Sequence, residues 1–134
     1  MTIMNYLCDT NIVSELWRPK PNPDVVMWVS EQTTISISVI TIEEIRYGLT
    51  WRPKPKIQTW FDEFIKTDCE LLSITDEIAD CAGRIRGRLA AQGLVHAQPD
   101  MLIAATAYVH KRILATRNIR DFQGCGIELL NPFQ

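Results

Sequence analysis

Short apolar runs alternate with helical patterns along this chain of 134 residues, and this alternation restricts the fold more than any other feature. The runs with strand character are rich in aliphatic and β-branched residues, and they occupy 3–8, 34–39, 70–74, 112–116 and 127–130. Strands that are apolar on both faces are typical of a parallel sheet that helices cover from both sides. We therefore predict an α/β fold, a three-layer α/β/α sandwich with a central, mostly parallel sheet.

Helices are predicted between these runs, with boundaries marked by proline, glycine and capping residues. The expected helical ranges are 11–16, 24–30, 41–49, 57–66, 76–93 and 101–110, followed by a turn or short helix at 117–122. Thr41 is expected to cap the helix at 41–49, and Thr75 or Asp76 to cap the long helix that ends at Gly93. A chain of this length corresponds to about one domain, so we predict a single domain over 1–134.

Charge and cysteine content restrict the class of protein. Fourteen Lys and Arg residues against sixteen Asp and Glu give a formal net charge of -2, which is not the positive field of a non-specific nucleic-acid binder. The four cysteines form no C-x-x-C pair, which favours reduced thiols in the cytoplasm over a zinc or redox site. The sequence shows neither a leader peptide nor an apolar run long enough for a membrane span. We expect a cytoplasmic protein without a membrane partner.

Four acidic residues lie beside element boundaries or on apolar helices: Asp9, Glu44, Asp100 and Asp121. Each has an ordinary structural explanation, such as a helix cap, a helix N-terminus or a solvated face. Together they suggest a site, because ligands of parallel sheets bind at the carboxyl ends of the strands. Carboxylates gathered there repel one another unless a cation lies among them, and hard oxygen ligands select Mg²⁺ or Mn²⁺. We expect oxygens of residues 9, 44 and 100 to converge on such an ion.

Four segments resemble, in order and spacing, the motifs of PIN-domain nucleases. They are Y-L-C-D-T-N-I-V-S-E-L at 6–16, S-V-I-T-I-E-E-I-R-Y-G at 38–48, P-D-M-L-I-A-A-T-A at 99–107 and A-T-R-N-I-R-D-F at 115–122. The resemblance covers nearly the whole chain and is strongest to the VapC and FitB toxins of bacterial toxin–antitoxin pairs. It implies a PIN-like fold and a Mg²⁺-dependent endoribonuclease, the toxin of a type II pair, that a partner antitoxin keeps silent. Similar toxins form dimers, so the expected partners are RNA, an antitoxin and a second copy of the chain.

The resemblance also assigns roles to individual acids. Asp9 matches the aspartate of the first motif and Asp100 that of the third, the two residues that most directly hold metal in similar proteins. Glu44 matches the acid of the second motif, although helical geometry alone does not choose between Glu43 and Glu44. The implied metal ligands are thus Asp9, Asp100 and Glu44. The fourth motif departs from the usual pattern, because Asn118 stands where many relatives have an acid; Asp121 is the candidate for that charge, and one or two ions remain open.

Several neighbouring residues would support catalysis. Asn11 and Thr116 are expected to position the acids from outside the metal ligand set, and Asn118 to orient water or offer a neutral oxygen. Arg46, Arg117 and Arg120 are candidate contacts for RNA phosphates, with ordinary solvated arginine as the equal alternative for each. The histidines, His96 and His110, have no paired partner, so a metal-free two-histidine ribonuclease gains no support.

Two other functions fit parts of the sequence. A phosphoaspartyl transferase would also place an aspartate after the first strand, but it usually needs a second acid two residues later, where this chain has Asn11. The other alternative is a catalytically silent PIN-like or receiver-like domain that only binds proteins, which the Asn118 departure would permit.

One sequence repeat is not explained by either function. The peptide Trp-Arg-Pro-Lys-Pro occurs at 17–21 and again at 51–55. Two copies with unlike flanks do not make a helical solenoid, so we interpret both as proline-rich loops between helices. The tryptophans, Trp17, Trp28, Trp51 and Trp60, are expected to pack in the core or at an interface, because aromatic side chains are more often buried than used for stacking on bases.

Overall fold

The computed structural model describes residues 5–133 and contains a five-stranded sheet in the order β3-β2-β1-β4-β5. Every pairing between neighbouring strands is parallel. The strands are β1 (Tyr6–Cys8), β2 (Ile35–Ser38), β3 (Cys69–Leu72), β4 (Ile113–Ala115) and β5 (Leu129–Leu130). This confirms the predicted parallel sheet. Each strand is shorter than its predicted run; four of them lie inside their runs, and β3 begins one residue earlier, at Cys69. The start of the first predicted strand, at 3 and 4, lies outside the described residues.

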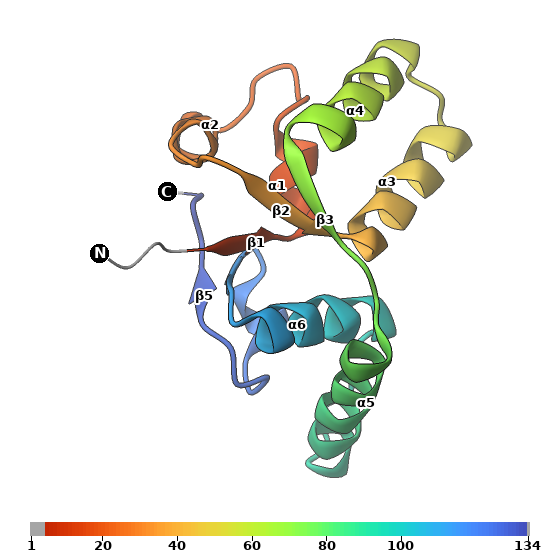
Figure 1. Ribbon diagram of the computed structural model, residues 1–134, viewed down its shortest axis with the longest axis vertical. Helices are drawn as coiled ribbons and strands as arrows, with labels where there is room; N and C mark the ends of the chain where they lie inside the picture. The colour runs from red at the N-terminus through yellow and green to blue at the C-terminus, as the bar shows by residue number, and fades with distance from the viewer. Residues whose placement is uncertain (1–4, 134) are drawn as a thin grey trace.

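Helices cover both faces of the sheet (Figure 1). They are α1 (Thr10–Glu15), α2 (Pro23–Ser30), α3 (Val39–Trp51), α4 (Pro55–Thr67), α5 (Asp76–Ala91) and α6 (Gln98–His110), with a 3₁₀ helix, η1 (Ile119–Phe122), after β4. One core packs Leu7 and Leu114 of the sheet against α5 and α6, and the other packs Cys8 and Ala115 against α1 to α4. Consecutive strand residues thus enter opposite cores, as the pleat requires. The predicted three-layer sandwich is confirmed.

One predicted helix cap is wrong. Helix α3 begins at Val39, because the hydroxyl of Ser38 accepts a hydrogen bond from the amide of Ile40 at 3.0 Å and caps the helix there. Thr41 therefore lies inside the first turn, where it is fully buried. The expected cap of α5 is confirmed, since the hydroxyl of Thr75 accepts from the amide of Ile78 at 3.2 Å.

The strand order places several segments at one edge of the sheet. Strand β1 lies between β2 and β4, and the chain leaves the carboxyl end of β1 directly into α1. Thr116 follows β4 at the same edge, and the crossovers bring the start of α3 and the start of α6 to it from opposite faces. This is the position where open parallel sheets form their ligand crevice.

Candidate active site

Asp9 lies at the centre of this edge, immediately after β1, with 6% of its surface exposed. It caps α1 by accepting from the amide of Thr10 at 2.8 Å, and it also accepts from the hydroxyl of Thr116 at 2.8 Å and from the Asn11 amide group at 3.2 Å. Burial raises the pKa of Asp9, the hydrogen bonds from Thr116 and Thr10 oppose that rise, and the charges of Glu44 and Asp121 add to it. Asp9 therefore both caps α1 and belongs to a cluster of negative charges.

Thr116 and Asn11 join the end of β1 to the end of β4. Besides donating to Asp9, the Thr116 hydroxyl accepts from the backbone amide of Asn118 at 3.0 Å and from the Asn11 amide group at 3.4 Å. The Asn11 side-chain oxygen accepts from the backbone amide of Arg117 at 3.1 Å. The structure thus brings both expected supporting residues into contact with Asp9 or its partners, whereas Asn118 contributes its backbone amide to this network.

Glu44 reaches the same edge from α3. Its carboxylate accepts from the hydroxyl of Thr10 at 2.6 Å, and Thr10 in turn lies 3.0 Å from the hydroxyl of the buried Thr41. The adjacent Glu43 is exposed to solvent, whereas Glu44 is half-buried. The tertiary structure therefore distinguishes the two glutamates, which helical spacing alone did not.

Asp100 enters from the first turn of α6. Burial raises its pKa to about 6, the negative charges of Asp9, Asp121 and Glu44 add to the rise, and His96 opposes it. Asp121, in η1, is exposed but close enough for its charge to act on both Asp9 and Asp100. All four predicted acids therefore share one electrostatic environment.

The acids do not form a closed metal cluster as the side chains stand. Among residues 5–133, no three His, Cys, Asp or Glu side chains are close enough together to hold an ion. The expected convergence of residues 9, 44 and 100 to coordination distance is thus not observed, because hydrogen-bond donors hold Asp9 and Glu44 in place and like charges repel. The chemistry of the donor set still fits a hard divalent cation, since a positive charge among these carboxylates would relieve their repulsion.

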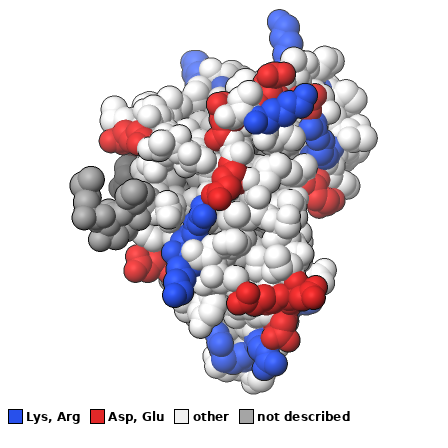
Figure 2. Space-filling view, viewed as in Figure 1, with Lys and Arg blue, Asp and Glu red and all other residues white. Residues whose placement is uncertain are grey.

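The three predicted phosphate contacts differ in their surroundings. Arg46 pairs with Asp62 of α4 and lies over the ring of Phe61 at 4.9 Å, so it joins α3 to α4 and is not a free cation at the site. Arg117 is exposed and lies 5.1 Å from the ring of Phe133, and Arg120 is exposed in η1. On the face shown in Figure 2, acidic and basic side chains are interspersed and neither sign dominates. An anionic substrate would therefore bind through individual cationic side chains and not through a broad positive surface.

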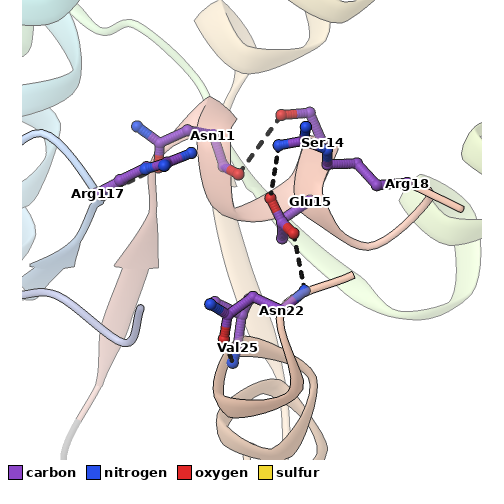
Figure 3. Close-up of polar contacts among 7 residues, drawn as sticks. All are labelled: Asn11, Ser14, Glu15, Arg18, Asn22, Val25 and Arg117. Atoms are coloured by element: carbon purple, nitrogen blue, oxygen red, sulfur yellow. Dashed lines mark hydrogen bonds and ion pairs between the residues drawn. The ribbon is translucent and has the colours of Figure 1, made fainter. Parts of the chain in front are cut away.

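Sequence reasoning missed the buried acid of α1. Glu15 has 6% of its surface exposed, and its carboxylate accepts from the Arg18 guanidinium at 3.3 Å and from the backbone amide of Asn22 at 2.8 Å (Figure 3). These bonds close the first proline-rich loop against α1. The only signal in the sequence is the apolar neighbourhood of Val13 and Leu16, which is too weak to identify a buried carboxylate.

His96 also has a closer relation to the site than its sequence suggested. Its charge lowers the pKa of Asp100, and its Nε2 atom is buried without a hydrogen-bond partner among the described residues. The charge of His110 instead helps to lower the pKa of Glu70, which lies outside the site.

Known proteins resemble this chain over nearly its whole length. The PIN domain family model matches residues 6–124. The VapC ribonuclease Y4jK of Sinorhizobium fredii is 30% identical, over 94% of this chain and 96% of that protein. The crystal structure of FitAcB from Neisseria gonorrhoeae contains a chain that is 29% identical, covers 96% of this chain and 99% of its own, and superposes with a TM-score of 0.84. A DNA-bound VapBC2 structure from Rickettsia felis matches with a TM-score of 0.79 at 27% identity, over 96% of this chain and 98% of its own.

The range matched by the family model, 6–124, spans Asp9, Glu44, Asp100 and Asp121, and the parallel sheet agrees with the fold of the similar structures. Nucleases of this kind generally depend on a divalent metal ion. The chain belongs to the PIN domain family, among the relatives of the VapC and FitB toxins.

Proposed function

We propose that this protein is a Mg²⁺-dependent endoribonuclease, the toxin of a type II toxin–antitoxin pair. The observation that carries the proposal is the gathering of Asp9, Glu44, Asp100 and Asp121 from four separate elements at one sheet edge. Repulsion among these carboxylates helps to raise the pKa values of Asp9 and Asp100, which is a cost that an ordinary structural site would avoid. A bound cation offsets that cost.

Asp9, Asp100 and Glu44 would hold the ion. Their hard oxygens suit Mg²⁺, with Mn²⁺ as a substitute, and Asn118 in place of an acid favours a site with one ion. Such an ion polarises a phosphoryl oxygen and lowers the pKa of an attacking water.

Other side chains of the protein would position the acids, the water and the RNA phosphates. Thr116 and the amide of Thr10 hold the Asp9 carboxylate at the carboxyl end of β1. Glu44, which accepts a hydrogen bond from Thr10, would orient water or accept its proton, and Asp121 adds negative charge to the cluster. Arg117 and Arg120, both exposed beside this edge, would contact the phosphates of RNA.

A cognate antitoxin would restrain this activity. The similar structures named above are those of FitAcB and of VapBC2 bound to a DNA fragment from their promoter. We propose an equivalent antitoxin partner for this chain, with a homodimer as the unit that the antitoxin binds. No helix in residues 5–133 has the length and apolar character needed to cross a bilayer. A cytoplasmic location for the pair remains a prediction.

Cleavage of total RNA by the purified protein tests the proposal. We expect discrete cuts with Mg²⁺ and none with EDTA, and we expect Asp9→Asn and Asp100→Asn to abolish them. Asp80→Asn is the matched control, because Asp80 is an exposed partner of Arg84 on α5 and belongs to no part of the site. Full activity in both site variants would defeat the nuclease assignment. Inactivity of the wild-type protein with every RNA and metal tested would instead favour the protein-binding alternative.

A further inference from the structure

A cavity of about 440 Å³ lies directly beside Glu44, and the active site described above does not account for it. Thr10 and Glu44, which are hydrogen-bonded to each other, form its end toward the acids. Its other walls include Trp17, Trp51 and Lys54. We call it the tryptophan pocket. A cavity of this volume is large enough for a small ligand group.

Both copies of the repeated Trp-Arg-Pro-Lys-Pro peptide contribute to this pocket. Trp17 comes from the copy at 17–21, and the copy at 51–55 supplies Trp51, Arg52 and Lys54. The copies meet because α1 packs against α3 and each copy follows or overlaps the end of one of these helices. The two copies of the repeat therefore line one pocket, although they do not build a solenoid.

The first copy forms a fixed wall. The ring of Trp17 packs edge-on against Trp60, with centroids 5.7 Å apart, and against Phe61 at 6.3 Å. Glu15 pairs with Arg18 and so restrains the loop that follows Trp17 (Figure 3). Arg18, the arginine of this copy, is thus already paired with Glu15. The packing of Trp17 is consistent with the core role predicted for it.

The second copy is exposed to solvent. Trp51 has 66% of its surface exposed, which differs from the packing expected for it, and the Arg52 guanidinium lies 4.7 Å from the centre of one of its rings. No ion pair in the described part of the chain involves Arg52 or Lys54. An exposed indole and two cations without acidic partners thus line a cavity that ends at Glu44.

We propose that the tryptophan pocket binds an unpaired nucleotide of the RNA substrate next to the scissile phosphate. Its base stacks on Trp51, and Arg52 and Lys54 contact the phosphate on the side away from the acids. The inference rests on the proposed ribonuclease function. An RNA strand suits these groups because every base has an aromatic face and every phosphate a negative charge. Continuity with Glu44 places the nucleotide adjacent to the bond that is cut.

Binding of a fluorescent, single-stranded RNA 12-mer of mixed sequence, measured by anisotropy in EDTA, tests the pocket without cleavage. We expect Trp51→Ala to weaken binding by about tenfold or more, and Trp51→Phe to restore most of the affinity, because stacking contributes this much per base. Tyr108→Ala is the matched control, since Tyr108 is an exposed aromatic residue that does not line the pocket. A duplex of the same length should be insensitive to Trp51→Ala.

The two cations give a second readout. The double variant Arg52→Gln/Lys54→Gln should reduce the slope of log affinity against log salt by about 0.7, because both cations contact one phosphate and each neutralised phosphate on a single strand contributes about 0.7. Arg86→Gln/Lys111→Gln removes two exposed cations that lie outside the pocket and should change the slope less. With metal present, all pocket variants should raise KM more than they lower kcat.

Three results would overturn the inference. One is unchanged affinity in Trp51→Ala together with an unchanged salt slope in the double variant. Another is normal RNA binding and cleavage in variants that escape neutralisation by the antitoxin, which would make the pocket a protein-binding surface. The third is no 12-mer binding by a wild-type protein that cleaves RNA. Failure of the wild-type protein to cleave RNA would instead refute the proposed function, so the two failures are distinguishable.

Discussion

Removing the charge of Asp100 should stabilise the metal-free protein while abolishing its activity. Burial and the surrounding acids raise the pKa of this carboxyl from 3.8 to about 6, so the folded state holds its proton more tightly than the unfolded state does. The free energy of unfolding of the wild-type protein therefore falls as the pH rises from about 4 to about 6 and stays reduced above that range. Asp100→Asn has no such charge to lose.

The expected gain follows from the size of the shift. A rise from 3.8 to about 6 corresponds to about 3 kcal/mol if none of it is screened. Water reaches much of the Asp100 side chain, so we reduce this value by about half. Loss of a negative charge from the first turn of α6 costs about 0.5 kcal/mol. The net gain is about 1 kcal/mol, or about 3 °C in Tm for a domain of this size.

Thermal unfolding in EDTA measures this difference. At pH 7.5 we expect Asp100→Asn to melt about 3 °C above the wild-type protein, and at pH 4 we expect the difference to vanish or reverse slightly. Asp76→Asn is the matched control: Asp76 is an exposed aspartate in the first turn of α5, and its removal should cost stability at pH 7.5. A variant less stable than the wild-type protein at pH 7.5, or an equal gain at both pH values, would show that burial and the neighbouring acids do not raise the pKa of Asp100 as inferred.

Three further outcomes are expected. Glu15→Ala should lower the free energy of unfolding in urea by about 2 kcal/mol, because the half-buried backbone amide of Asn22 loses a charged acceptor, whereas Glu31→Ala at an exposed position should have little effect. Millimolar Mg²⁺ or Mn²⁺ should raise the Tm of the wild-type protein by a few degrees but not that of Asp9→Asn; equal shifts in both would place the ion elsewhere. Glu44→Gln should lower kcat about a hundredfold, whereas Glu43→Gln should cleave RNA at the wild-type rate, and the reverse order would contradict the site.

The helices and strands were predictable because their signals are local. The apolar runs around Leu7 and Leu114 are buried on both faces of the sheet, and Thr75 caps its helix as expected. The error at Thr41 has the same origin. Ser38 and Thr41 are both acceptable helix caps, and only the contact between Thr41 and Thr10 in the folded protein shows that Thr41 lies in the interior.

The surroundings of the arginines and glutamates could not be predicted in this way. Arg46 looked like a phosphate contact beside the second motif, but it pairs with Asp62, sixteen residues later on another helix. Glu15 received no role from the sequence, and in the structure it is buried by the loop that it closes. Each outcome depends on a partner distant from the local pattern, which a helix or strand period does not encode.

The sequence by itself determined the alternation of strands and helices, the likeness to one nuclease family and the choice of candidate acids, because hydrophobic periodicity and motif order are properties of neighbouring residues. Only the tertiary structure decided which glutamate accepts a hydrogen bond from Thr10, and that the other acids raise the pKa of Asp100. It also brought two distant copies of one pentapeptide to the same cavity. Charge repulsion, burial and cavity shape depend on distances through space, and those distances are set when the crossovers of the parallel sheet bring remote segments to one edge.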